Sequence, residues 1–83
     1  MIEVRLMGTP ACRRYQRMRD LILAEVRKLG VEIRLTEIGD TASLSQVNPL
    51  SLPRLYVGDE LLASQNPPKA DVISQVLSKL MNL

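Results

Sequence analysis

The stretch TPACRRYQ, residues 9–16, separates two different patterns of apolar residues. Before it, apolar side chains alternate with others over residues 2–7, which is typical of a β-strand with one face more buried than the other. After it, apolar residues recur at helical spacing over residues 11–29, which predicts a long helix. Cys12, the single cysteine of the chain, lies where this helix is expected to begin.

A second strand is expected soon after the helix. Gly30 is a residue type that commonly follows a helix C-terminus. Residues 31–36 then alternate again, with Val31, Ile33 and Leu35 expected on the buried face. A strand, a helix and a strand with short connections form a βαβ unit, so the two strands should be parallel with a right-handed crossover. The helix face expected to be buried consists of Ala11, Tyr15, Met18, Ile22, Val26 and Leu29.

The second half of the chain predicts a short helix, a hairpin and a final helix. Asp40 or Thr41 is a suitable N-cap for a short helix over residues 42–47. The runs RLYV and LLAS flank Gly58-Asp59-Glu60, a combination that favours an antiparallel hairpin. The final helix is expected to have Asn66 as its N-cap and Pro67 as its first residue. Its apolar stripe consists of Val72, Ile73, Val76, Leu77, Leu80 and Met81.

The composition restricts the chemistry. The chain has 83 residues, which predicts one small domain. It has one cysteine and no histidine, so it lacks an internal disulfide, Cys-His catalysis and a cysteine or histidine metal cluster. We expect no metal and no cofactor. No apolar run approaches the length of a membrane span, and residues 1–8 do not resemble a signal peptide. We expect a cytoplasmic monomer with no membrane or nucleic-acid partner, since the net charge is only +2.

The predicted order β-α-β-(short α)-β-β-α, with a cysteine at the first strand-to-helix junction and a proline before the third strand, resembles the thioredoxin fold. TPACRRY is similar to the Cys-x-x-Cys motif of this family, and SLPRLYVGDELLAS to its cis-proline, strand, turn, strand segment. The closest resemblance is to the small, glutaredoxin-sized thioredoxins. It implies one α/β domain over residues 1–83 with a four-stranded mixed sheet, two long helices on one face and the short helix on the other.

The resemblance also implies roles for individual residues. Cys12 matches the nucleophilic cysteine, and Tyr15 stands where the resolving cysteine is usually found. Pro53 matches the cis-proline, and Leu52 stands where the family often has threonine. These two residues, with Arg13 and Tyr15, are expected to border the substrate. Glutaredoxins usually hold glutathione with Gly-Gly and Asp after the strand pair, whereas this chain has LLASQNPP there.

The residues around Cys12 allow two interpretations. A lone cysteine is often a small buried apolar residue. At a helix N-terminus, however, backbone N–H groups and the helix dipole stabilise a thiolate, and we favour this interpretation. Arg13 and Arg14 are unfavourable at a helix start unless an anion is present, whereas Arg17 and Arg19 are expected to form a solvated basic surface. Without neighbouring aromatic residues, this arginine cluster does not predict base stacking.

Two functions therefore remain open. The first is monothiol thiol–disulfide exchange through Cys12 in cell redox homeostasis, acting on a protein disulfide or a low-molecular-weight thiol. The alternative is a degenerate thioredoxin-like module that binds a partner without redox chemistry. Reduction of an oxyanion by one thiol beside arginines is a third, less supported option. For Tyr15, packing is the favoured role, and a hydrogen bond from its hydroxyl to the Cys12 sulfur is the alternative.

Overall fold

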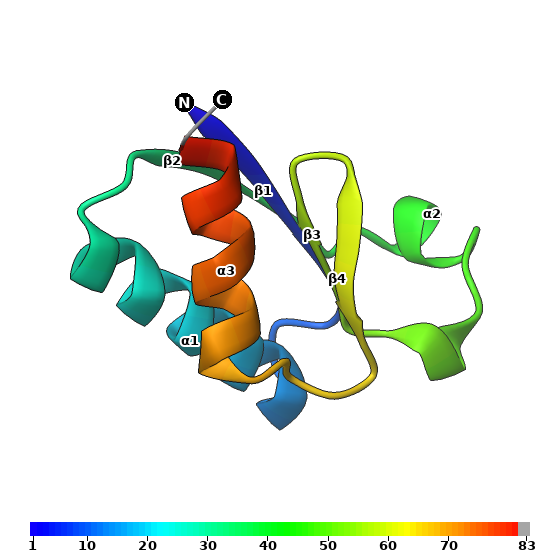
Figure 1. Ribbon diagram of the computed structural model, residues 1–83. Helices are drawn as coiled ribbons and strands as arrows, with labels where there is room; N and C mark the ends of the chain where they lie inside the picture. Colours follow the sequence, from blue (N-terminus) through cyan, green and yellow to red (C-terminus); the bar gives the residue numbers. More distant parts are fainter. Residues whose placement is uncertain (82–83) are drawn as a thin grey trace.

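The computed structural model describes residues 1–81 of the chain (Figure 1). It contains the expected order of a strand, a helix, a strand, a short helix, two strands and a helix. The elements are β1 (Ile2–Met7), α1 (Arg13–Leu29), β2 (Ile33–Ile38), α2 (Thr41–Leu44), the 3-10 turn η1 (Pro49–Ser51), β3 (Arg54–Val57), β4 (Glu60–Ser64) and α3 (Ala70–Met81).

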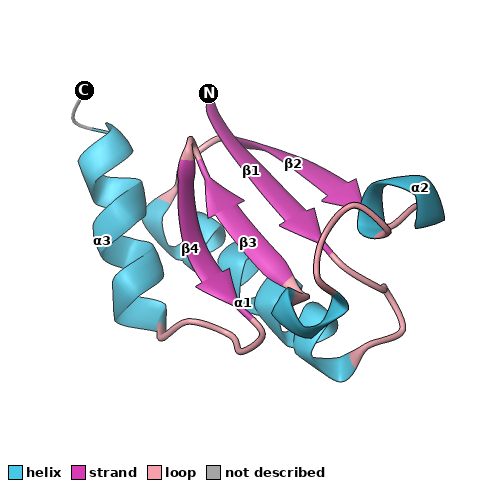
Figure 2. Cartoon of the chain, turned by 90° about the vertical axis from the view of Figure 1, so that its right-hand side faces the viewer, coloured by secondary structure: helices cyan, strands magenta, loops and turns pink. Residues whose placement is uncertain are grey.

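The four strands form one mixed sheet in the order β2-β1-β3-β4. β1 pairs with β2 in parallel and with β3 in antiparallel orientation, and β3 pairs with β4 in antiparallel orientation. The predicted βαβ unit and the predicted hairpin are therefore confirmed. Figures 1 and 2 show α1 and α3 on one side of the sheet and α2 on the other, near the end of β2.

The core lies between the sheet and the two long helices. Side chains along a strand alternate between the two faces of the sheet, and the buried apolar residues of the strands lie on the same face. The fully buried side chains are Val4, Leu6, Tyr15, Met18, Ile22, Leu55, Val57, Ile73 and Leu77. On α1 the expected face is confirmed at positions 15, 18 and 22, whereas Val26 and Leu29 are only partly buried and Glu25 is buried instead.

The start of α1 differs from the prediction. The backbone N–H of Cys12 donates to the Thr9 carbonyl at 2.9 Å, which closes a turn before the helix. Cys12 is the N-cap and Arg13 the first helical residue. Ala11 is exposed in the turn, so it does not belong to the buried helix face.

The start of β2 is also later than predicted. Gly30 has a φ of 67°, a left-handed conformation that glycine adopts without steric cost. The N–H groups of Gly30 and Val31 both donate to the Val26 carbonyl, which ends α1 in a Schellman-type cap. Val31 therefore completes the helix end, and the strand begins at Ile33.

The short and final helices have corrected boundaries. α2 ends at Leu44 rather than at residue 47, and its N-cap is Asp40. α3 begins at Ala70, so Pro67 is not its first residue and Asn66 is not its N-cap. The ring of Pro68 disfavours the helical conformation of the residue before it, which delays the helix beyond the two prolines.

Candidate active site

Three segments of the chain converge at the end of the sheet from which α1 begins. The Gly8 N–H donates to the Ile38 carbonyl at 3.0 Å, which joins the ends of β1 and β2. A Cβ atom on Gly8 would lie 3.0 Å from both Pro53 Cβ and Tyr15 Cδ2, and one on Gly39 would lie 3.2 Å from the Gly8 carbonyl oxygen. Glycine at position 8 thus permits the proline before β3 to pack against the junction that precedes α1.

Pro53 is buried at this junction, and the Leu52–Pro53 peptide bond is cis. This is the conformation that the sequence resemblance implies. Leu52 is partly buried and ends η1, with its N–H donating to the Pro49 carbonyl at 3.3 Å. The structure therefore places Pro53 beside Gly8, in the loop region that leads to Cys12.

Cys12 lies at the N-cap of α1 with extended backbone angles of φ −72° and ψ 132°. Its carbonyl accepts the first helical hydrogen bond, from the Gln16 N–H at 3.1 Å. The side chain is partly buried against the core, and within residues 1–81 its sulfur makes no capping hydrogen bond. α1 has no acidic residue in its first turn, so no carboxylate there compensates the positive end of the helix dipole. This end of the dipole is therefore available to stabilise a Cys12 thiolate.

The arginines that follow Cys12 are not equivalent. Arg13, Arg14 and Arg17 are exposed and form no ion pair with any residue of the described chain. Arg19 was expected to belong to the same solvated surface. Its Nε atom instead lies 3.4 Å from Glu37 Oε1 on β2, although its side chain is still 48% exposed.

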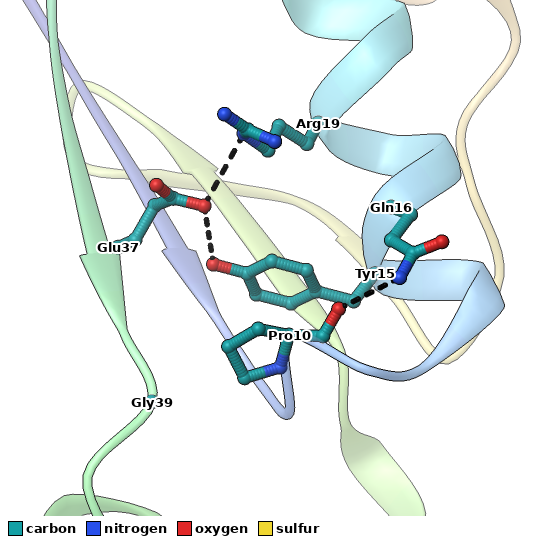
Figure 3. Close-up of a pocket in the computed structure, with 6 residues that line it drawn as sticks. All are labelled: Pro10, Tyr15, Gln16, Arg19, Glu37 and Gly39. Carbon is teal, nitrogen blue, oxygen red and sulfur yellow. Dashed lines mark hydrogen bonds and ion pairs between the residues drawn. The ribbon is translucent and has the colours of Figure 1, made fainter.

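Tyr15 is buried beneath the start of α1, with 1% of its surface exposed. Its hydroxyl donates to Glu37 Oε1 at 2.7 Å (Figure 3). The hydroxyl proton is therefore committed to Glu37, and the alternative of a hydrogen bond to the Cys12 sulfur is wrong. Burial raises the pKa of Tyr15 well above its ordinary value, and the hydrogen bond and negative charge of Glu37 raise it further, so the hydroxyl remains a donor.

Glu37 was not identified from the sequence, although a signal for it was present. It follows Ile33 and Leu35 at a spacing of two residues, so it continues the strand face that points toward α1. Its carboxylate is exposed enough to remain solvated, at 42% of the side-chain surface, and still reaches Tyr15. A charged residue at the end of the buried face of a strand indicates a polar contact with the helix that packs on that face, here α1.

The turn η1, next to the cis-proline, presents an exposed apolar residue. Asn48 accepts a hydrogen bond from the Leu50 N–H through its side chain at 3.0 Å and from the Ser51 N–H through its carbonyl at 2.9 Å. Ser64 Oγ donates to the Ser51 carbonyl at 2.7 Å and fastens the turn to β4. Leu50 is 74% exposed on this braced turn, another feature that the sequence interpretation missed.

Two further findings concern residues 1–81. In this part of the chain, no group of three or more His, Cys, Asp or Glu side chains is arranged to hold a metal ion. None of its helices is long and apolar enough to cross a membrane.

Comparison with known proteins supports the architecture. No family model matches the chain, and a search of curated proteins finds no similar sequence. Among solved structures, the crystal structure of glutaredoxin 1 from Francisella tularensis complexed with cacodylate is similar, with a TM-score of 0.52 and 15% sequence identity. The match covers 100% of both chains. Together with the mixed four-stranded sheet, this likeness shows that the chain has a thioredoxin-like fold.

Proposed function

We propose that this chain is a glutaredoxin-like monothiol thiol–disulfide exchange protein and that Cys12 is its nucleophile. The observation that carries the proposal is the position of Cys12 at the N-cap of α1, in a thioredoxin-like fold whose buried cis-proline packs at the same junction. Backbone N–H groups at a helix N-terminus favour a thiolate, and the thiolate is the form of cysteine that attacks disulfides.

The reaction has two balanced steps. The Cys12 thiolate attacks one sulfur of a disulfide, forms a mixed disulfide and releases the other sulfur as a thiolate. Since the chain has one cysteine, an external thiolate then attacks the substrate sulfur of the mixed disulfide. This second step regenerates the Cys12 thiolate and leaves a disulfide between the substrate and the external thiol. The substrate is a protein disulfide or a low-molecular-weight thiol in its oxidised form.

The neighbouring residues have different roles in this proposal. Arg13, exposed at the first position of α1, stabilises the negative charge of the thiolate. Leu52 and Pro53 border the substrate beside the thiol. Tyr15 was expected to contact the substrate, but its burial and its hydrogen bond to Glu37 make it a support for the start of the helix. We place this chemistry in a monomer and in a reducing compartment such as the cytoplasm, where a lone thiol remains free.

The alternative function is a degenerate thioredoxin-like module that binds a partner without redox chemistry. One observation favours it: the residue that stands where the resemblance expects the resolving cysteine is a buried tyrosine with a hydrogen-bonded hydroxyl. The two functions differ in whether the Cys12 sulfur exchanges with a disulfide.

Incubation with oxidised glutathione separates them. We expect intact-protein mass spectrometry to show the addition of one glutathione to the wild type and none to Cys12→Ser. Excess reduced glutathione should then remove the adduct, because it supplies the second thiolate. A wild-type protein that remains unmodified while a short peptide containing TPACRRY is modified would overturn the exchange function and favour the binding module.

The contribution of Arg13 is tested by a matched pair of variants. Arg13→Gln should slow alkylation of Cys12 by iodoacetamide at pH 7, because it removes a cation from the start of α1. Arg27→Gln removes an exposed cation from the last turn of the same helix and should leave the rate unchanged. Equal rates in both variants would assign Arg13 to the solvated surface.

A further inference from the structure

The face of the sheet opposite α1 and α3 carries a second group of arginines. No long helix of residues 1–81 covers this face (Figure 2). Arg5 on β1 lies opposite Tyr56 on β3, and Arg54 precedes Tyr56 by two positions, so the three side chains share one face. All three are partly buried. Because α1 packs on the other face, this group is separate from the proposed chemistry of Cys12.

The Arg54 side chain is held in one orientation by two hydrogen bonds. Its Nε donates to Ser51 Oγ at 3.0 Å, and its Nη1 donates to the Tyr56 hydroxyl at 3.1 Å. Ser51 Oγ in turn donates to the Asn48 carbonyl at 2.6 Å, which orients its oxygen as an acceptor for Arg54. The Nη2 atom of Arg54 forms no hydrogen bond within residues 1–81 and remains a donor.

Tyr56 brings a second cation to the same place. The Arg5 guanidinium carbon lies 4.7 Å from the centre of the Tyr56 ring, which is a cation–π contact. Because the Tyr56 hydroxyl oxygen accepts a hydrogen bond from Arg54, its own proton is available for an acceptor outside the chain. Two guanidinium groups and one O–H donor therefore meet at a single side chain.

No carboxylate pairs with these two cations. Neither Arg5 nor Arg54 forms an ion pair in the described part of the chain. Glu3 and Asp59 line a hollow of about 220 Å³ with Arg5, at the hairpin-turn end of the face, whereas Arg54 lies toward the other end, where β3 begins. Two like charges held at one residue repel each other, and a bound anion would remove that cost.

We infer that Arg5, Arg54 and Tyr56 form a binding site for a phosphate monoester. This group carries a charge of about −1.5 to −2 at pH 7 and three acceptor oxygens, which match two guanidinium groups and one hydroxyl donor. The planar guanidinium of arginine can also bind two phosphate oxygens at once. A carboxylate has a single charge and two oxygens, so it would leave part of this donor set without a partner.

Titration of ¹⁵N-labelled protein followed by NMR tests this inference at constant ionic strength. The probes are glycerol 3-phosphate, a short glycine peptide with a central phosphoserine, and glycerate, which has a carboxylate in place of the phosphate group. We expect both phosphate probes to shift the Arg54 Nε–H and Tyr56 amide signals in a saturable manner. Glycerate should bind at least about five-fold more weakly, the change that one partly exposed ion pair produces.

The two phosphate probes also distinguish the sources of the group. Tighter binding of the peptide would indicate a phosphorylated protein, and equal or tighter binding of glycerol 3-phosphate would indicate a small phosphate ester. Both results support the site.

Variants locate the site. Arg5→Gln and Arg54→Gln should each weaken binding of glycerol 3-phosphate by about five-fold or more. Arg27→Gln removes an exposed cation from the last turn of α1 and should not change the affinity. Glu3→Gln removes a carboxylate that repels the anion and should strengthen binding, a gain that misfolding cannot produce. Cys12→Ser should bind normally, so a failure of the thiol chemistry would not affect this result.

The shift dispersion of each variant shows whether it is folded, which keeps a loss of binding interpretable. The inference would be overturned if neither phosphate probe produced a saturable shift, or if glycerate bound as tightly as glycerol 3-phosphate. A loss of affinity in Arg27→Gln as large as that in Arg54→Gln would also overturn it, because net charge alone would then explain the binding.

Discussion

At the scale of single residues, position 15 distinguishes this chain from a dithiol protein. Tyr15 stands where the thioredoxin resemblance expects a second cysteine, and its side chain fills part of the core. Its hydroxyl also connects α1 to β2 through Glu37. Tyr15 is thus a structural link between a helix and an edge strand.

Substitutions at Tyr15 should separate the contribution of the ring from that of the hydroxyl. Tyr15→Phe keeps the ring, so we expect the free energy of unfolding to fall by about 0.5–1.5 kcal/mol, the value of one hydrogen bond. Tyr15→Cys creates a Cys-x-x-Cys sequence but removes most of a buried ring, which should cost about 3 kcal/mol or more. This is a large part of the roughly 5–15 kcal/mol that stabilises a typical domain.

Urea unfolding followed by circular dichroism measures both effects. Tyr56→Phe is the matched control, because it also removes a hydrogen-bonded tyrosine hydroxyl. The Tyr56 hydroxyl accepts a hydrogen bond from Arg54 Nη1 at 3.1 Å and lies on the other face of the sheet. If Tyr15→Cys proved as stable as Tyr15→Phe, the ring would not be part of the core as described.

At the scale of secondary-structure elements, local caps decide where the helices begin and end. Asp40 Oδ2 accepts hydrogen bonds from the Ser43 N–H at 2.9 Å and the Ser43 hydroxyl at 2.8 Å, which starts α2. Gly30 ends α1 in a left-handed conformation. α2 buries none of its residues. Its cap therefore contributes a larger share of its stability than the caps of α1 and α3 contribute to theirs.

The Asp40 cap should make α2 sensitive to acid. The hydrogen bond from the Ser43 N–H, followed by that from the Ser43 hydroxyl, lowers the pKa of Asp40 below its ordinary value of 3.8. The capping contribution is therefore complete above that ordinary value and is lost as the pH falls through the lowered pKa of the folded state. The Ser43 amide shift should titrate with a midpoint below 3.8.

The Asp40→Asn variant is the control for this titration, because asparagine also caps a helix but does not ionise. Its Ser43 amide should show no such transition. A midpoint in the wild type at or above 3.8 would mean that the capping hydrogen bonds do not form in solution.

At the scale of the whole molecule, the two faces of the sheet have different environments. α1 and α3 cover one face, whereas α2 is too short to cover the other (Figure 2). On the open face, the Arg5 guanidinium lies 4.7 Å from the centre of the Tyr56 ring, and Leu61 beside it is 48% exposed. Long polar side chains therefore shield the sheet from water where a helix does not.

This difference predicts unequal costs for two leucine substitutions in the hairpin. Leu55→Ala removes a fully buried side chain and should lower the free energy of unfolding by about 2–5 kcal/mol. Leu61→Ala truncates a half-exposed side chain on the open face and should cost less than about 1 kcal/mol. Chemical denaturation of both variants measures the difference, and equal costs would contradict a sheet with one open face.

The order of elements and most of the core could be predicted from the sequence, because both depend on local patterns. Alternation placed Val4 and Leu6 inward, and helical spacing did the same for Met18 and Ile22. The position of Cys12 at a helix start was also readable, since a turn and a helical pattern meet there. The boundaries of helices and strands were less predictable. At residues 30–31 capping hydrogen bonds extend the end of α1, and at residues 67–70 two consecutive prolines delay the start of α3, and the apolar pattern shows neither effect.

Only the tertiary structure decided which polar side chains meet. Tyr15 and Glu37 are separated by 22 positions in the chain, and no local pattern predicts that the hydroxyl points to a carboxylate rather than to Cys12. The same holds for Gly8, whose missing side chain matters because Pro53, in the loop before β3, packs against it. Periodicity specifies which face of an element is buried, but the partner across the core depends on how the elements pack, and that is a property of the folded chain.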